Sequence, residues 1–276
     1  MTSYRRHAIT GEPVIFAPER ADRPGAFVDT VDRARCPFCA GHEEDTPPEI
    51  LRVGTPWKIR VVPNKYPSVP GAEVIIESPD HDATFDRIEH TAAVVRVYVE
   101  RHRAHAGAAH VALFKNEGAR AGSSIQHLHS QLMPLPFVPP RVERELAGFA
   151  HACPLCDDVA DDLVIRETSA FTWFTPYASS TPYQQWIVPK RHTPAIAEFT
   201  SAEIDELASL LRSAAAATRG IADAFNWMFM TFPPGSAAHC YLELFPRMTT
   251  LAGLELGTGT FVEIVDPVAA ARRLRS

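Results

Sequence analysis

Alternation of hydrophobic and polar residues predicts a chain of short strands and two long helices. Residues 74–76 and 186–188 are short apolar runs, which predict buried strands. Each run is followed by a longer segment with apolar residues at helical spacing, which predicts helices over about 86–105 and 200–225. The second helix should begin with a capping box, because a threonine at its start precedes a glutamate by three residues.

The same pattern predicts further strands after each helix. We expect a strand over 111–114 after the first helix and a strand over 227–232 after the second. A turn rich in Gly, Ser or Pro then leads into a further strand that carries His127 or His239. A last helix is expected from the Asp-Pro pair at 266–267, which is typical of an N-cap and a first helical residue.

This repeated order of elements indicates two tandem copies of one module. Each copy is predicted to be a meander of antiparallel strands with one long helix packed on it, which is an α+β arrangement. The proline-rich stretch 134–140 and the charged stretch 141–145 separate the copies. We therefore expect an N-terminal module over 1–145 and a C-terminal module over 146–276.

Composition narrows the classes of protein that this chain could be. Its 276 residues are 46% hydrophobic, which is enough for one or two domains with a hydrophobic core. A net charge of −6 argues against a nucleic-acid-binding surface. No apolar run reaches the roughly 18 residues of a membrane span, and the N-terminal residues lack a signal-peptide pattern. We expect a cytoplasmic protein without a membrane or nucleic-acid partner.

Four of the five cysteines form two Cys-x-x-Cys pairs, and two histidines follow each pair at similar intervals. In a reducing cytosol such pairs are more often metal ligands or redox centres than disulfides. One pair alone could be a thioredoxin-type centre, but two pairs with matching histidines favour zinc. The expected sites are Cys36, Cys39, His81 and His127, and Cys153, Cys156, His192 and His239. Cys240 is expected to be a plain thiol.

The row His127-Leu-His129-Ser-Gln131 is the strongest candidate for chemistry. In an extended strand alternate side chains share a face, so both imidazoles and the carboxamide would line one surface. If His127 binds metal, His129 lies roughly 6.5–7 Å further on, too far to bind the same ion. A neutral imidazole is a nucleophile toward phosphorus, and the turn at 122–124 could bring N–H groups to phosphate oxygens. The alternatives are one metal site with both imidazoles, or a half-exposed strand without chemistry.

The block LFKNEGARAGSSIQHLHSQLM resembles the active-site strand of the histidine-triad superfamily. More narrowly, the chain resembles the branch of galactose-1-phosphate uridylyltransferase and the ADP-glucose phosphorylase-like proteins. The resemblance covers nearly the whole chain, including CPFC, VVPNKYPSV, ESPDH, PYQQWIVPKRH and GLELGTGTFVEI. It implies tandem histidine-triad-like modules, a homodimer and zinc at both metal sites. Some relatives hold iron in the second site, but the two cysteines there favour zinc.

The resemblance also implies roles for individual residues. His129 would be the nucleophile that accepts a nucleoside monophosphate, and Ser124 and Gln131 would contact the transferred phosphoryl group. Other substrate contacts would be Arg20, Arg23, Phe38, Asn64, Asn116, Ser123 and Glu255. Glu255 is assigned to a sugar hydroxyl, because the aromatic-acidic pair of galactose enzymes is replaced here by residues 256–259. That replacement weakens a role in galactose metabolism.

These features predict a nucleotidyltransferase. It would move a nucleoside monophosphate between a nucleotide sugar and a phosphate or sugar-1-phosphate acceptor through a covalent nucleotidyl-histidine. Gln131 stands where a third histidine could relay a proton, which favours transfer over hydrolysis. Tyr241 stands at the nucleophile's place in the second copy, so only the first copy should be catalytic. The rivals are a hydrolase of the same superfamily, a zinc-ribbon nucleic-acid-binding protein and an inactive zinc scaffold.

Overall fold

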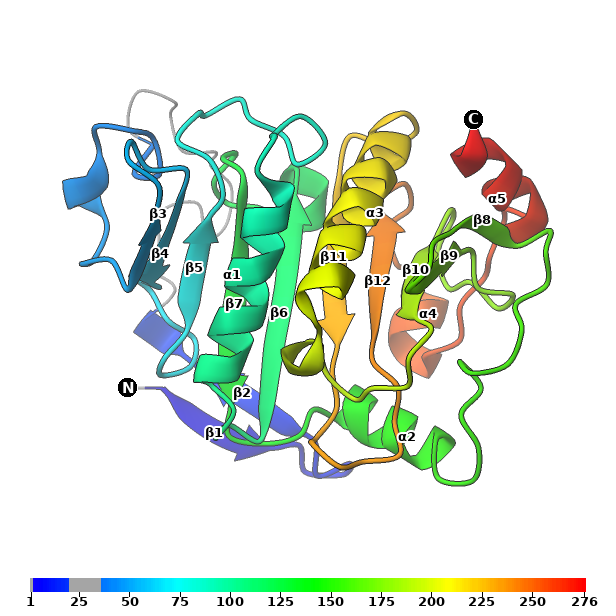
Figure 1. Cartoon of the computed structure of the whole chain (residues 1–276). Coiled ribbons are helices and arrows are strands. Elements are labelled where there is room, and N and C mark those ends of the chain that lie inside the picture. The colour runs from blue at the N-terminus through cyan, green and yellow to red at the C-terminus, as the bar shows by residue number, and fades with distance from the viewer. Residues whose placement is uncertain (1, 20–35) are drawn as a thin grey trace.

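The computed structural model describes residues 2–19 and 36–276, and Figure 1 shows strands and helices arranged around one large sheet. The strands are β1 (Ser3–Arg6), β2 (Pro13–Phe16), β3 (Leu51–Val53), β4 (Ile59–Pro63), β5 (Glu73–Ile76), β6 (His110–Glu117), β7 (His129–Leu135), β8 (Val164–Glu167), β9 (Phe171–Phe174), β10 (Gln185–Pro189), β11 (Phe225–Met230) and β12 (Tyr241–Pro246). The α-helices are α1 (Thr91–Ala104), α2 (Pro140–Gly148), α3 (Ser201–Arg219), α4 (Gly253–Thr258) and α5 (Pro267–Arg275).

Ten strands form one antiparallel sheet in the order β3-β4-β5-β7-β6-β11-β12-β10-β9-β8. The order is symmetric about its centre, since each strand of the first half has a counterpart at the same distance on the other side. The halves meet where β6 pairs with β11, with Glu117 opposite Phe225. The predicted α+β fold of two tandem modules is confirmed, and the modules share one continuous sheet.

The two long helices cover the same face of this sheet. Helices α1 and α3 lie side by side in front of the strands in Figure 1. Between them and the sheet is the main hydrophobic core, which includes Val95 and Val99 from α1 and Leu207 and Leu211 from α3. Burying these apolar stripes stabilises both helices, because helices of this length are marginal without tertiary packing.

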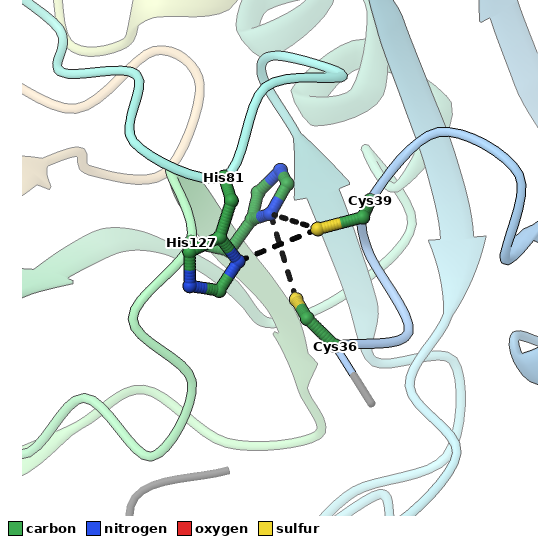
Figure 2. Close-up of side chains that lie close together, drawn as sticks. All are labelled: Cys36, Cys39, His81 and His127. Atoms are coloured by element: carbon green, nitrogen blue, oxygen red, sulfur yellow. Dashed lines mark hydrogen bonds between the residues drawn. The ribbon is translucent and has the colours of Figure 1, made fainter. Parts of the chain in front are cut away.

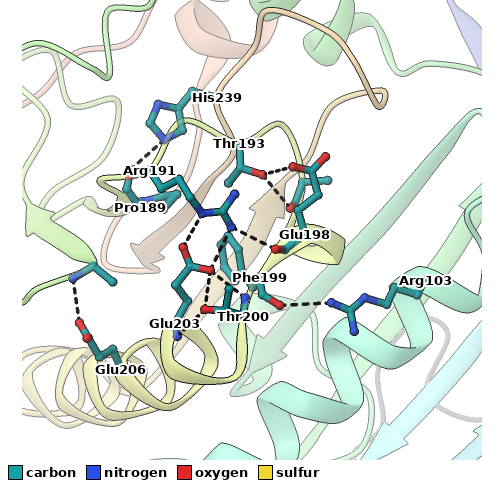
Figure 3. Close-up of polar contacts among 12 residues, drawn as sticks. Arg103, Pro189, Arg191, Thr193, Glu198, Phe199, Thr200, Glu203, Glu206 and His239 are labelled. Carbon is teal, nitrogen blue, oxygen red and sulfur yellow. Dashed lines mark hydrogen bonds and ion pairs between the residues drawn. The ribbon is translucent and has the colours of Figure 1, made fainter.

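Helix α3 begins as its sequence predicts. Thr200 accepts a hydrogen bond from the backbone N–H of Glu203, and the Glu203 carboxylate accepts one from the backbone N–H of Thr200. Arg191 binds the same carboxylate, which holds the pKa of Glu203 at about 2 (Figure 3). Hydrogen bonding to Arg191 is the main cause of this shift. The capping box is therefore confirmed and is reinforced by an ion pair.

Both predicted helices were too long. Helix α1 begins at Thr91, because residues 84–90 form turns in which Asp86 binds the Arg219 side chain. Helix α3 ends at Arg219, because Phe225 already belongs to strand β11. Apolar spacing alone could not separate these helices from the turns beside them.

The predicted meander was also wrong in its strand order. Strand β7 lies between β5 and β6, with Val74 opposite Gln131 on one side and Phe114 opposite Gln131 on the other. The chain therefore leaves β5, forms α1, returns as β6 and only then inserts β7.

No described helix is long and apolar enough to cross a membrane.

Candidate active site and metal sites

The first four expected metal ligands converge beside the start of β7 (Figure 2). The Cys36 Sγ lies 3.5 Å from His127 Nδ1, and the Cys39 Sγ lies 3.4 Å from His81 Nδ1. Ligands 2.0–2.3 Å from a tetrahedral zinc ion are separated by about 3.5 Å. The spacing and the donor set therefore fit a Cys₂His₂ metal site.

The second set of ligands has the same arrangement. The Cys153 Sγ lies 3.5 Å from His239 Nδ1, and the Cys156 Sγ lies 3.2 Å from His192 Nδ1. All four ligand atoms lie within 4.8 Å of one another. The structure thus brings together both predicted ligand sets from residues far apart in the sequence.

In each set, the ring of one histidine is fixed by a backbone carbonyl. His127 Nε2 donates to the Ser78 carbonyl at 2.7 Å, and His239 Nε2 donates to the Pro189 carbonyl at 2.8 Å (Figure 3). A carbonyl can only accept, so the proton lies on Nε2 and Nδ1 keeps its lone pair. This is the arrangement found around metal-binding histidines, whose second ring nitrogen is held by an acceptor.

A cavity of about 620 Å³ lies beside the first metal cluster. Five residues expected at the site line it: Phe38, Asn64, Ser124, His129 and Gln131. Gln131 and His129 reach it from the face of β7 opposite helix α1, because Ser130 between them hydrogen-bonds to Tyr98 of that helix. The cavity is therefore the candidate active site.

His129 has the properties of a nucleophile. Its Nδ1 donates to the His127 carbonyl at 2.7 Å, so the lone pair lies on Nε2. Nε2 has no hydrogen-bond partner among the described residues. Burial lowers the pKa of His129 to about 4, so the ring is neutral at pH 7. An uncharged imidazole with one fixed proton is ready to attack an electrophile.

The two histidines of the row face different ways. Strand β7 begins at His129, so His127 lies before the strand and not in it as predicted. One ring reaches the cysteines and the other reaches the cavity. Phe38 lies against both, with ring centroids 5.9 Å from His127 and 5.3 Å from His129. The metal cluster and the candidate nucleophile therefore share one wall.

Other expected substrate contacts lie elsewhere. The Ser123 hydroxyl donates to the backbone carbonyl two residues on, and the side-chain amide oxygen of Asn116 accepts from the side chain of Asn226 in β11. The Glu255 carboxylate accepts a backbone N–H at the start of α4. None of these three residues lines the described cavity. Two further expected contacts, Arg20 and Arg23, lie outside the described residues.

Several cavity residues were missed by the sequence reasoning. They include His42, Asp45, Thr46 and Pro47, which follow the first Cys-x-x-Cys pair within eight residues. Their position after the Cys36–Cys39 turn was the available signal, because that turn lies against the start of β7. The loop of the expected Asn64 was not missed, since Lys65 and Tyr66 beside it also line the cavity.

The corresponding place in the second half is filled by side chains. Tyr241 follows His239 as His129 follows His127, and its ring lies 4.7 Å from that of Trp186. Arg141 of α2 lies 2.7 Å from the Glu243 carboxylate and donates to the Tyr241 hydroxyl at 3.2 Å. In the second half Tyr241 and Glu243 thus stand at the places of His129 and Gln131, and both are bound by Arg141.

Replacing Tyr241 with phenylalanine should therefore affect stability but not catalysis. Tyr241→Phe loses hydrogen bonds to Arg141 and Glu145, so we expect the free energy of unfolding to fall by about 1 kcal/mol. Urea unfolding and a transfer assay measure the two effects. Tyr177→Phe, at a ring that is 86% exposed, is the control and should change neither. A slower reaction in folded Tyr241→Phe would contradict a purely structural second half.

Comparison with known proteins assigns the chain to a family. No protein-family model matches it. It is 30% identical to the ADP-glucose phosphorylase of Arabidopsis thaliana, over 98% of this chain and 92% of that one. The chain belongs to the family of ADP-glucose phosphorylase and galactose-1-phosphate uridylyltransferase. The family resemblance seen in the sequence is confirmed.

Two further comparisons agree. The chain is 26% identical to the galactose-1-phosphate uridylyltransferase of Thermotoga maritima, over 100% of this chain and 98% of that one. The crystal structure of the Arabidopsis thaliana ADP-glucose phosphorylase with bound ADP-glucose has a TM-score of 0.82 at 30% identity, covering 100% of this chain and 99% of that one. Members of this family are nucleotidyltransferases, and so is this chain.

Proposed function

We propose that this enzyme moves a nucleoside monophosphate between a nucleotide sugar and a phosphate or sugar-1-phosphate acceptor. The nucleotide would be carried on Nε2 of His129 during transfer. The observation that carries the proposal is the buried, neutral His129 ring, whose only fixed proton is on Nδ1 and which lines the cavity. Full-length similarity to a phosphorylase and a uridylyltransferase of nucleotide sugars supports it.

The reaction divides into two displacements at one phosphorus. In the first, the lone pair of His129 Nε2 attacks the α-phosphorus, the bond to the sugar phosphate oxygen breaks, and sugar phosphate leaves with the electron pair. The ring becomes cationic, and its Nδ1–H stays bound to the His127 carbonyl, which stabilises that charge. In the second, an acceptor phosphate oxygen attacks and Nε2 regains its lone pair. No proton has to move when the acceptor is an anionic phosphate.

The neighbours of His129 would hold the phosphoryl oxygens. Gln131 lies two residues further along β7 on the same face, and Ser124 lines the cavity from the loop before that strand. Both can donate hydrogen bonds to oxygens on which negative charge builds up in the transition state. Gln131 has no acidic proton to pass to a leaving group or from a water, which favours phosphate acceptors. Arg20 and Arg23 are proposed as further phosphate contacts.

The remaining cavity wall suits a nucleoside. Phe38, Val62, Val74 and Ile125 provide apolar surface for a base, and Asn64 provides an amide edge. Sites for such ligands are mostly apolar with a few placed polar groups. We propose Asn64 and Phe38 as base or ribose contacts. We propose Asn116 and Ser123 as further nucleotide contacts, although neither lines the cavity. Glu255 is proposed to hydrogen-bond to a sugar hydroxyl.

We propose zinc at both metal sites. Two thiolates and two imidazoles at tetrahedral spacing are a typical zinc donor set, and thiolate pairs favour zinc over iron in the second site as well. A bound zinc ion would supply a cross-link between segments distant in sequence. In the first site these are the Cys36–Cys39 turn, the segment after β5 that carries His81, and His127 beside the nucleophile.

The division of the chain, its assembly and its compartment are further proposals. We propose a module boundary near residue 145, which lies within α2. We propose a homodimer in the cytoplasm. Exposed apolar side chains support an interface, and examples are Val14 in β2 and Leu256, Val262 and Ile264 near the C-terminus.

A substrate panel tests the proposed function. The metal-loaded enzyme is incubated with ADP-glucose, UDP-glucose or UDP-galactose, with and without inorganic phosphate or a sugar 1-phosphate, and products are separated by chromatography. We expect repeated turnover to sugar 1-phosphate and a nucleoside diphosphate only when phosphate is present, and sugar exchange with a sugar-1-phosphate acceptor. Free nucleoside monophosphate formed without any acceptor would contradict transfer and favour the hydrolase.

A further inference from the structure

A buried polar network lies beneath His129, on the side of β7 that faces helix α1. Its centre is an ion pair between Lys115 of β6 and Glu77, which are 1% and 0% exposed. Lys115 Nζ lies 2.6 Å from the Glu77 carboxylate and donates a second hydrogen bond, of 2.8 Å, to the backbone carbonyl of His129. A charged group inside the core is therefore bound directly to the backbone of the candidate nucleophile.

The rest of the network provides hydrogen bonds to the Glu77 carboxylate. Its other carboxylate oxygen accepts from the Ser130 hydroxyl at 2.5 Å and from the Tyr98 hydroxyl. The Tyr98 and Ser130 oxygens also lie 2.7 Å apart. Burial, together with the nearby Glu77 charge, holds the pKa of Tyr98 well above its ordinary value, so this hydroxyl keeps its proton and donates.

Stability alone is a poor reason for such a network. Burying two charges costs several kcal/mol per ion, and well-packed apolar side chains of the same volume are often as stabilising. The β6–β7 pairing ends where Phe114 lies opposite Gln131, before it reaches His129. The Lys115 side chain binds the His129 carbonyl just beyond that point.

The second half of the chain shows the apolar alternative. In the first half Phe114 lies opposite Gln131, and in the second half Met228 lies opposite Glu243. The residue after Phe114 is Lys115 and the residue after Met228 is Phe229, so Phe229 occupies the place of Lys115. The place of Ser130 is taken by Leu242, which lies opposite Phe229. The counterpart of the segment that carries Glu77 is the uncharged end of β10. Where Tyr241 stands in place of His129, the positions that match the ion pair and Ser130 are therefore uncharged.

We propose that the Lys115–Glu77 pair is a positioning device for His129. By binding the carbonyl of the first residue of β7, Lys115 fixes the peptide plane from which the imidazole projects and so the direction of Nε2. Glu77, held by Tyr98 and Ser130, fixes the ammonium group in turn. The inference rests on the proposed role of His129 and adds residues that do not touch the substrate.

A charge-neutral double variant tests this role. Lys115→Met with Glu77→Gln removes the ion pair and the bond to His129 but nearly keeps the volume, and the amide oxygen can still accept from Tyr98 and Ser130. We expect kcat to fall by roughly 10- to 100-fold, because an ångström-scale misplacement of a reacting group costs about that much. The KM for the nucleotide sugar should stay within about 2-fold of wild type, since no cavity residue changes.

A second buried ion pair on β5 provides the matched control. Arg101 of α1 lies 2.7 Å from Glu73, whose side chain is 4% exposed. Glu73 lies opposite Leu132 in β7, three residues beyond His129. Arg101→Met with Glu73→Gln removes a similar pair at the other end of the strand, and we expect its kcat to equal that of wild type. A loss of kcat in both double variants would show a general effect of lost ion pairs and would overturn the proposal.

The outcome does not depend on one variant folding. A fully apolar version, with Glu77→Leu, Tyr98→Phe, Lys115→Met and Ser130→Ala, leaves no side chain of the network unpaired, so we expect it to fold. The His129 carbonyl is the one group that loses its donor. This version should also be slow, and wild-type kcat in this or the double variant would overturn the proposal. A wild-type enzyme without any transfer activity would instead overturn the proposed function.

Discussion

His129→Ala should abolish nucleotidyl transfer while leaving the fold and both metal sites intact. The side chain supplies the only nucleophile proposed for the reaction, so we expect the rate to fall by roughly 10⁴-fold or more. His129 is not a member of either metal cluster, and its side chain hydrogen bond is to the carbonyl of His127. The rate of sugar 1-phosphate release and the metal content per chain are the two measurements.

An exposed histidine provides the control for this variant. His151→Ala changes the same residue type in the loop after α2, and we expect wild-type transfer. Thermal unfolding of both variants should be close to that of the wild-type enzyme. Full nucleotidyl exchange by folded His129→Ala would mean that another group carries the nucleotide or that transfer is direct.

His127→Ala should lose one metal ion per chain and much stability. The substitution removes one of four ligands and the hydrogen bond to the Ser78 carbonyl. Structural zinc contributes on the order of 10–16 kcal/mol of binding free energy in small domains, so partial loss of the site should lower the free energy of unfolding by several kcal/mol. Metal analysis should fall from two ions to one, and thermal unfolding should show a lower midpoint.

His90→Ala is the matched control for the metal site. His90 Nε2 also donates to a backbone carbonyl, that of Glu77 at 2.8 Å, but His90 belongs to neither cluster. We expect about 1 kcal/mol of lost stability and two metal ions retained. Two ions retained by His127→Ala would show that His127 is not a ligand.

The two Cys₂His₂ clusters could be predicted because their signal is repeated. One Cys-x-x-Cys pair with distant histidines is ambiguous, but the same order in both halves made Cys36 to His127 and Cys153 to His239 one pattern. Different roles for His127 and His129 could be predicted from the second half, where His239 matches the first histidine and Tyr241 replaces the second.

Other features depend on contacts that the sequence does not show. The insertion of β7 between β5 and β6 is a choice between strand partners of similar apolar character. Asp86 lies in turns because it binds Arg219, more than a hundred residues away. From the sequence, a lysine at position 115 in an otherwise apolar strand would be expected to be exposed. In the structure it is buried, because Glu77 lies beside it in the core. Such pairings are set by tertiary structure and not by local spacing.

The central claim is that His129 carries the nucleotide, and mass spectrometry of the intact protein tests it most directly. The metal-loaded enzyme is mixed with each nucleotide sugar in the absence of an acceptor, and the modified residue is then mapped by peptide fragmentation. We predict an added mass of one nucleoside monophosphate on His129, which disappears when inorganic phosphate is added. Transfer that proceeds with no adduct, or with an adduct on another residue, would contradict the account.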